Sequence, residues 1–253
     1  SDIVLCLLTA FLAGAGGYLV AYPYGKSVGL LAVPTGLAVW TLQGGTVHSV
    51  LLTHSAFEQR LAVYRFFRIE TFFWLAMLAC GAAGIWLAAR FFPSKTAPAV
   101  PAPPLKKTTA KQIVSILAAV LASVVTVQLT VGLFAQDVRY PDTHIGSVTG
   151  QPGNRQIAFA LLASFTLAGA IIKYFLDCDH YWAVLASPIL YFFVISKSCS
   201  PQILQYMTEN WAVAYFPNTI STILPIQIVS FSAIGALAGQ WLVVKYKMPK
   251  KDS

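Results

Sequence analysis

Three histidines, His48, His54 and His144, are the residues best suited to metal chemistry, because imidazole binds zinc and copper. His48 and His54 are six positions apart, so they do not share one helix face as ligands spaced by four residues would. His144 lies in a separate polar stretch beside Asp137 and Asp142. The metal hypothesis needs all three to converge in the folded chain. Scattered, solvated side chains are the alternative that we favour, and we therefore expect neither a metal nor another cofactor.

The other acid–base candidates lie in one short turn. Asp177 and Asp179 flank a cysteine and precede His180, an arrangement typical of a cap before a helix. Lys173, one turn earlier, can extend its amine to the membrane surface beside these acids. The sequence contains no Gly-x-Ser-x-Gly, P-loop, His-Glu-x-x-His or dinucleotide fingerprint. We predict that the chain is not an enzyme.

The composition predicts an integral membrane protein. Hydrophobic residues make up 57% of the chain and charged residues 10%, with a mean hydropathy of +0.68. Soluble domains carry about 25% charged residues. Seven continuous apolar runs approach the length that a membrane-spanning helix needs. They cover residues 3–22, 28–46, 71–92, 113–135, 156–176, 181–199 and 222–244.

No run carries a charged residue near its centre. Ion-coupled transporters place carboxylates or other ionisable groups inside the membrane. The sequence therefore disfavours transport that is driven by protons or sodium.

The net charge of +8 predicts the orientation. Cations cluster between the third and fourth runs and again near the C-terminus, four crossings later, so both clusters can lie in the cytoplasm. We expect a bacterial inner membrane protein with its N-terminus outside and its C-terminus in the cytoplasm. Membrane lipid is an expected partner and nucleic acid is not. Four residues at the cytoplasmic ends of two runs are expected at the lipid interface: Trp86, Arg90, Trp241 and Lys245.

An internal repeat predicts the architecture. Residues 83–91 and 238–246 share the pattern Ala-Gly-x-Trp-Leu, two small apolar residues, a cation and an aromatic residue, at a shift of 155 positions. Weaker matches join 7–15 with 161–170 and 31–34 with 185–188. Helices four crossings apart point the same way. We predict an all-α protein of seven transmembrane helices in two parallel three-helix repeats.

The expected organisation has five parts. Residues 1–92 form the first repeat, 93–112 a cytoplasmic linker rich in Pro, Ala and Lys, 113–135 a linker helix, 136–155 an outer polar loop, and 156–253 the second repeat with a basic tail. Residues 47–70 and 200–221 are expected to be outer-face interfacial segments. This plan of three, one and three helices resembles that of SWEET-type sugar facilitators, and the resemblance is one of architecture only.

Small residues are candidates for helix contacts. Glycines at helix positions let backbones approach closely, either within this bundle or against another subunit. These are Gly14, Gly17, Gly84, Gly235 and Gly239. We expect Pro34 and Pro188 to kink the second and sixth spans. Gln240 stands where the first repeat has Ile85, which singles it out for a role specific to the second repeat.

Two functions follow from these patterns. The first is a non-catalytic transmembrane subunit that anchors other membrane-protein subunits in a larger complex. The alternative is a facilitator of an uncharged small solute or lipid, with its site at the repeat interface. The alternative needs a polar path, for which Gln128, Gln227 and Gln240 are the candidates. If these three glutamines face one cavity, the second function gains support.

Overall fold

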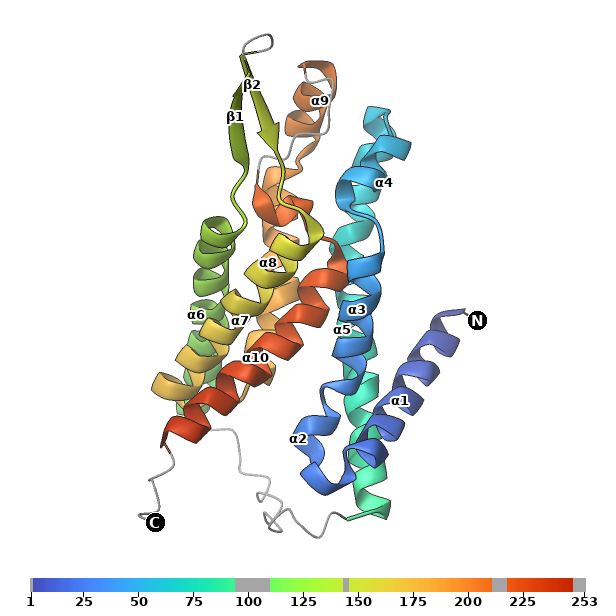
Figure 1. The fold of residues 1–253 in the computed structure, drawn as a ribbon, viewed down its shortest axis with the longest axis vertical. Helices are drawn as coiled ribbons and strands as arrows, with labels where there is room; N and C mark the ends of the chain where they lie inside the picture. Colours follow the sequence, from blue (N-terminus) through green and yellow to red (C-terminus); the bar gives the residue numbers. More distant parts are fainter. Residues whose placement is uncertain (1, 94–109, 143–145, 211–217, 248–253) are drawn as a thin grey trace.

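The computed structural model describes residues 2–93, 110–142, 146–210 and 218–247. It is an elongated bundle of helices with a β-hairpin at one end (Figure 1). Six of its helices are long and apolar enough to cross a membrane, which confirms an all-α membrane architecture. They are α1 (Asp2–Val20), α5 (Phe57–Phe91), α6 (Ala110–Phe134), α7 (Asn154–Leu176), α8 (Tyr181–Ser198) and α10 (Pro225–Lys247).

The bundle has a lower end and an upper end in the view of Figure 1. The lower end carries the C-terminal ends of α1, α5, α7 and α10 and the start of α6 and α8. The upper end carries α4 (Val47–Thr53), α9 (Pro201–Asn210) and the hairpin. Both predicted basic clusters therefore begin from the lower end, because Arg90 and Lys245 lie in the last turns of α5 and α10.

The predicted second span, 28–46, is broken into several pieces. A 3-10 turn at Tyr22–Tyr24 leads through Gly25 to the short α2 (Lys26–Gly29), and α3 (Ala32–Gln43) follows. Gly25 has a φ of 86°, a left-handed value that glycine adopts without strain. A seventh crossing exists only if α2, α3 and α4 are taken together as one bent span.

The bend in this span is not at Pro34, contrary to our expectation. Pro34 lies in the first turn of α3, where its missing N–H needs no helical partner. The chain instead turns by 54° after α3. Gly44 and Gly45 fill this break, and Thr46 starts α4 with a capping box to Ser49. Pro188, by contrast, does lie inside its helix.

Helix α5 corrects the prediction for residues 57–70. We expected an interfacial helix there, but these residues continue without a break into the third span, giving a helix of 35 residues. Such a helix is about 52 Å long, whereas the hydrocarbon core needs only about 20 residues. The charges at Glu58, Arg60, Arg65 and Arg68 had indicated a surface segment. With neither proline nor glycine before Gly81, nothing in this stretch ends the helix.

The predicted polar loop 136–155 contains regular structure. Strand β1 (Val138–Asp142) pairs antiparallel with β2 (Gly146–Gly150), in the register Val138 to Gly150 and Asp142 to Gly146. In the other predicted interfacial segment, 200–221, the structure places α9 and a 3-10 turn at Thr219–Thr222. Residues 211–217 of that segment lie outside the described residues.

The tightest helix crossings occur twice, 155 positions apart. Gly14 of α1 lies directly against the carbonyl group of Gly81 of α5. In the other half, Gly169 of α7 lies against Ala236 of α10, where a Cβ on Gly169 would sit 2.5 Å from the Ala236 carbonyl oxygen. Each residue of the second pair is 155 positions after its counterpart. Both crossings therefore require a glycine on the first helix.

A second pair of contacts repeats with the same shift. Gly84 of α5 packs on the carbonyl group of Phe11, and Gly239 of α10 packs on that of Thr166. Side chains at either glycine would overlap these backbone atoms. The α1–α5 and α7–α10 crossings thus use equivalent positions of their helices.

The two halves also pack across each other. Helix α3 packs mainly on α10, and α8 packs on both α5 and α10. Buried residues from both halves form the main core, among them Phe67, Phe165, Tyr191 and Phe231. Helices α3, α5, α8 and α10 consequently surround the centre of the molecule, whereas α1 and α6 lie at its periphery (Figure 1).

Candidate functional site

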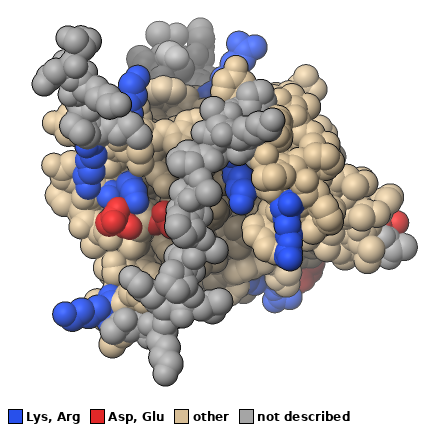
Figure 2. All heavy atoms as spheres, turned by 90° about the horizontal axis from the view of Figure 1, so that it is seen from below, with Lys and Arg blue, Asp and Glu red and all other residues tan. Residues whose placement is uncertain are grey.

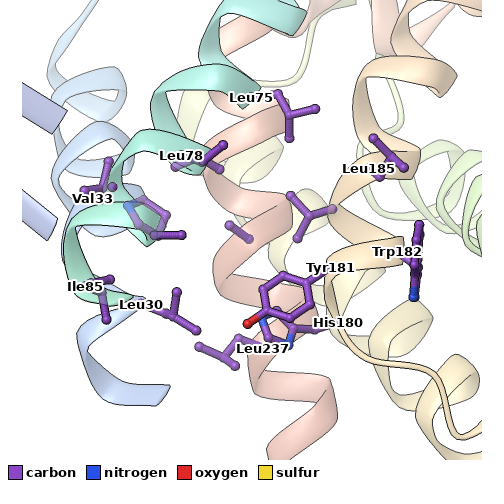
Figure 3. Close-up of a pocket in the computed structure, with 16 residues that line it drawn as sticks. Leu30, Val33, Leu75, Leu78, Ile85, His180, Tyr181, Trp182, Leu185 and Leu237 are labelled. Atoms are coloured by element: carbon purple, nitrogen blue, oxygen red, sulfur yellow. The ribbon is translucent and has the colours of Figure 1, made fainter. Parts of the chain in front are cut away.

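A cavity lies between the four central helices, in the lower part of the bundle (Figure 3). Its volume is about 320 Å³, within the range of small-molecule sites. The lining is almost entirely aliphatic and comes from α2–α3, α5, α8 and α10. It consists of Leu30, Val33, Pro34, Leu75, Leu78, Ala79, Gly81, Ala82, Ile85, His180, Tyr181, Trp182, Val184, Leu185, Ala233 and Leu237.

Both halves of the chain contribute equivalent positions to this lining. Ala82 and Leu237 are 155 positions apart, the shift that joins 83–91 with 238–246. Leu78 and Ala233 form a second such pair. The cavity is therefore at the interface between the two predicted repeats.

The cavity covers about half the depth of the helical bundle. Leu75 marks its upper limit in Figure 3, and His180 and Tyr181 lie near its lower limit. Leu75 is one turn below Phe72, whose ring packs on that of Phe192 at 6.4 Å between centroids. Since α8 runs from Tyr181 to Ser198, the upper limit is near the middle of α8. The cavity thus extends from mid-bundle to the lower end.

Several lining residues are accessible from outside the protein. Tyr181 is 54% exposed, Ala79 is exposed, and Leu30 and Leu185 are half-buried. Tyr181 and Ala79 lie in helices that are apolar enough to span a membrane. The cavity therefore opens on a surface that lipid would cover.

The polar groups of the cavity are concentrated at its lower end. His180 is 8% exposed, and its ring lies 4.0 Å from that of Tyr181, measured between centroids (Figure 3). The backbone N–H of His180 donates a hydrogen bond to Oε1 of Gln240 at 3.1 Å. Nδ1 of His180 lies 2.5 Å from the same oxygen. Gln240 thus ties the start of α8 to α10.

These two contacts define the tautomer of His180. A backbone N–H can only donate, so the Gln240 atom that it meets is the amide oxygen, an acceptor. Nδ1, which meets the same oxygen, must then carry the proton. Burial lowers the pKa of His180, which favours the neutral ring. Nε2 is consequently a hydrogen-bond acceptor.

The three glutamines do not share the cavity. Gln227 is buried near the upper end of α10, where its Oε1 accepts from the backbone N–H of Leu224 at 3.0 Å. Gln128 lies in α6, and its buried Oε1 has no partner among the described residues. Gln240 reaches the cavity only through His180, whereas its counterpart Ile85 lines it directly. No polar path runs along these three residues.

The predicted packing glycines make contacts inside this chain. Gly14, Gly84, Gly235 and Gly239 each lie within 3 Å of neighbouring backbone, measured from where a Cβ would stand. Gly17 packs on the side chain of Ala32. Of the two prolines, Pro34 lines the cavity and Pro188 is buried elsewhere in α8. These glycine positions are occupied by internal contacts and leave no surface for another subunit.

The four predicted lipid-interface residues lie on the outside of the bundle near its lower end. The guanidinium of Arg90 lies over the ring of Trp86 at 5.9 Å. Trp241 and Lys245 are exposed one turn apart on α10. Figure 2, viewed from below, shows Lys and Arg side chains around this end of the molecule.

The histidines of the metal hypothesis are not brought together in the part of the chain that the structure describes. His54 ends α4 and its Nδ1 lies 2.8 Å from the Val50 carbonyl oxygen. His48 lies in the same short helix, and its buried Nδ1 has no partner among the described residues. His144 lies outside the described residues. No group of three metal-ligating side chains occurs in residues 2–93, 110–142, 146–210 and 218–247.

One acid of the turn before α8, Asp177, has a structural partner. Asp177 accepts from Nζ of Lys173 at 2.7 Å, and this lysine lowers the pKa of the Asp177 carboxyl group. In the first half the corresponding positions are Tyr18 and Tyr22, whose rings pack edge to face at 6.3 Å. The Tyr18 hydroxyl donates to the Phe92 carbonyl at 2.7 Å. Equivalent helix ends are thus held by different chemistry.

Comparison with known proteins identifies no relative of this chain. No family model, curated protein or solved structure matches it. Function must therefore be argued from the cavity itself.

Proposed function

We propose that this protein takes up an uncharged, lipophilic small molecule or lipid from the membrane, in the cavity between its two halves. One observation carries the proposal: an aliphatic cavity lined at equivalent positions by both halves, with exposed residues of membrane-spanning helices at its mouth. Because lipid tails are as apolar as the aliphatic lining, van der Waals packing in the cavity, not removal from water, must hold such a ligand, and this needs no charged group.

The chemistry of the lining supports an apolar ligand over an ion. The cavity has no Asp, Glu, Lys or Arg, and a charge moved there would lose its hydration without a partner. The separated positions of the three glutamines argue against a continuous polar route for a sugar-like solute.

The repeated contacts support the finer architecture that we propose with this function. In it, seven crossings form two parallel three-helix repeats around the cavity, with α6 as the linker helix. Equivalent glycine crossings in α1–α5 and α7–α10 support the duplication. The pairing of α3 with α10 and of α8 with α5 supports an exchange of helices between the halves.

A cavity-filling substitution tests the function. Ala82 lines the cavity and Ala83, its neighbour on α5, is exposed outside it. We would purify wild type, Ala82→Phe and Ala83→Phe in a mild detergent and measure co-purifying lipids by native mass spectrometry. We expect a bound apolar molecule that is lost in Ala82→Phe and retained in Ala83→Phe. Equal retention in both variants, or no bound molecule in wild type, would contradict the proposal.

The second candidate function, a non-catalytic transmembrane subunit, is favoured by a separate observation. Helix α1 buries only Ala10, Gly14 and Tyr18, and most of its other apolar residues are exposed. Gly16 and Gly36 have no atom within 4 Å of a Cβ placed on them, so a partner helix could approach closely there. Native mass spectrometry of protein purified from its own membrane tests this function: other proteins in fixed stoichiometry are expected, and a lone chain would refute it.

We also propose a location in a bacterial inner membrane, with the lower end in the cytoplasm. The cations at the lower end support this orientation through the positive-inside rule (Figure 2). A fluorescent or enzymatic tag on the C-terminus should report the cytoplasm, and a cysteine in place of Glu209 of α9 should react with an impermeant reagent from outside.

A further inference from the structure

We propose that the ligand of this cavity is a single-chain neutral amphiphile of the lower leaflet, whose hydroxyl head group donates a hydrogen bond to Nε2 of His180. This inference rests on the proposed function and specifies the ligand of the same site.

The depth of the cavity matches one leaflet. From Leu75 to Ile85 the α5 backbone rises about 15 Å, half of the roughly 30 Å of a hydrocarbon core. The lining at the level of Leu75 and Leu78 is aliphatic, and His180 and Tyr181 lie at the other end (Figure 3). A lipid chain inserted from the lower leaflet would place its head group at His180 and its tail near mid-membrane.

The hydrogen-bonding groups at the lower end select the head group. Because Nδ1 of His180 carries the proton bonded to Gln240, Nε2 offers a lone pair and accepts a hydrogen bond. The hydroxyl of Tyr181, whose ring stacks beside that of His180, can accept and donate. An alcohol, which donates one hydrogen bond and accepts others, satisfies both residues.

The groups directly beside His180 and in the cavity lining disfavour an ionised head group, although cations lie further out at the same end of the bundle. Asp179 directly precedes His180 and Tyr181 in the chain, so its acidic group lies beside the lower end of the cavity. A carboxylate or phosphate head at the same place would be repelled by Asp179 and would meet no cation from the cavity lining. An ammonium head would face His180, whose ring accepts but whose burial opposes charge. A neutral hydroxyl avoids both costs.

Three photoreactive probes test the head group. Each carries a diazirine on the same saturated chain, and they end in a primary alcohol, a carboxylate or a methyl group. The protein is placed in phosphatidylcholine nanodiscs, irradiated, and digested for mass spectrometry. Labelling of the cavity residues is divided by labelling around Leu117 of α6, which is 64% exposed to lipid, so that membrane partitioning cancels.

We expect the alcohol to label the cavity about two- to tenfold more than the methyl-ended probe, the effect of one neutral hydrogen bond. Ala82→Phe should abolish cavity labelling by all probes. Equal labelling by the alcohol and the methyl-ended probe, or a preference for the carboxylate, would overturn the inference while leaving the proposed function in place. Absence of cavity labelling by all three probes in wild type would overturn both.

Two variants test the named residues. His180→Phe removes Nε2 but keeps an aromatic ring, and Tyr181→Phe removes one hydroxyl from an exposed side chain. Tyr174→Phe is the matched control, because Tyr174 is half-exposed at the same end of the bundle and does not line the cavity. The alcohol preference should be lost in His180→Phe, reduced in Tyr181→Phe and unchanged in Tyr174→Phe. A preference that survives both His180→Phe and Tyr181→Phe would refute the assignment, and melting temperatures establish that each variant is folded.

Discussion

Gly14 lies directly against the carbonyl group of Gly81, at the point where α1 crosses α5. A methyl group on Gly14 would overlap this backbone, which cannot move aside as a flexible side chain can. The contact brings α1 close to α5, and α1 has few other buried residues with which to hold its place.

Gly14→Ala should therefore destabilise the protein by about 1–3 kcal/mol, the usual range for overpacking. Gly16→Ala is the control, since a Cβ at Gly16 has no neighbour within 4 Å. Thermal unfolding in detergent, followed by tryptophan fluorescence, measures both. Equal melting temperatures for the two variants would contradict the close crossing.

The corresponding glycines of the two halves should respond alike. Gly84→Ala and Gly239→Ala each place a methyl group on the carbonyl of the facing helix, that of Phe11 or of Thr166. We expect losses of stability within about 1 kcal/mol of each other, because the same geometry is disturbed. A variant pair in which one substitution is silent would show that the two crossings are not equivalent.

The stability of the protein should decrease below about pH 6.5 because of His180. Burial lowers the pKa of His180 in the folded protein, so the unfolded chain binds the proton more readily. The contribution of His180 to the free energy of unfolding is constant above the ordinary histidine pKa of about 6.5. It becomes destabilising as the pH falls toward the lower pKa that His180 has in the folded protein. Melting temperatures at pH 8.0 and 5.5 should differ more for wild type than for His180→Phe. An identical pH response would exclude this role, since the other histidines are unchanged in the variant.

Cys199 should resist alkylation in the folded protein. It is buried, and burial raises the pKa of its thiol to about 12. At pH 8 only about one thiol in 10⁴ would be ionised, and the thiolate is the reactive form. N-ethylmaleimide should modify Cys199 after unfolding in SDS but not before. The exposed Cys6 is the internal comparison, and rapid labelling of Cys199 in the native state would contradict its burial.

Continuous apolar runs predicted the main helices well, because membrane-spanning segments must be long and uninterrupted. The predicted boundary of the third span was wrong, because charged residues there lie within a continuous helix. The charged residues from Glu58 to Glu70 suggested a segment apart from the third span, yet helical hydrogen bonding continues through them. The prediction for the second span was wrong for the opposite reason, because its apolar composition hid the interruption between α2 and α3 and the break at Gly44–Gly45.

A site at the repeat interface was predicted as an alternative, but most of the residues that line the cavity were not, because they depend on how α3 and α8 pack across the two halves, and hydropathy carries no such information. One signal in the sequence does bear on it. Gln240 stands where the repeat has Ile85, and this change supplies the acceptor that holds His180 at the end of the cavity. His180 itself had been interpreted only as part of a helix cap. The difference between Gln240 and Ile85 was therefore the feature of the sequence that indicated the polar end of the cavity.

Helix α5 is continuous and connects the two ends of the bundle. Its first turns lie at the upper end beside α4, and its residues 75–85 form one wall of the cavity near the opposite end (Figure 1). With no proline or glycine between residues 57 and 80, the helix has no hinge above that wall. The same unbroken helix therefore places Leu61, Tyr64 and Phe67 in the main core near the upper end and the cavity wall near the lower end, so that a tilt of α5 at one end would move residues at the other.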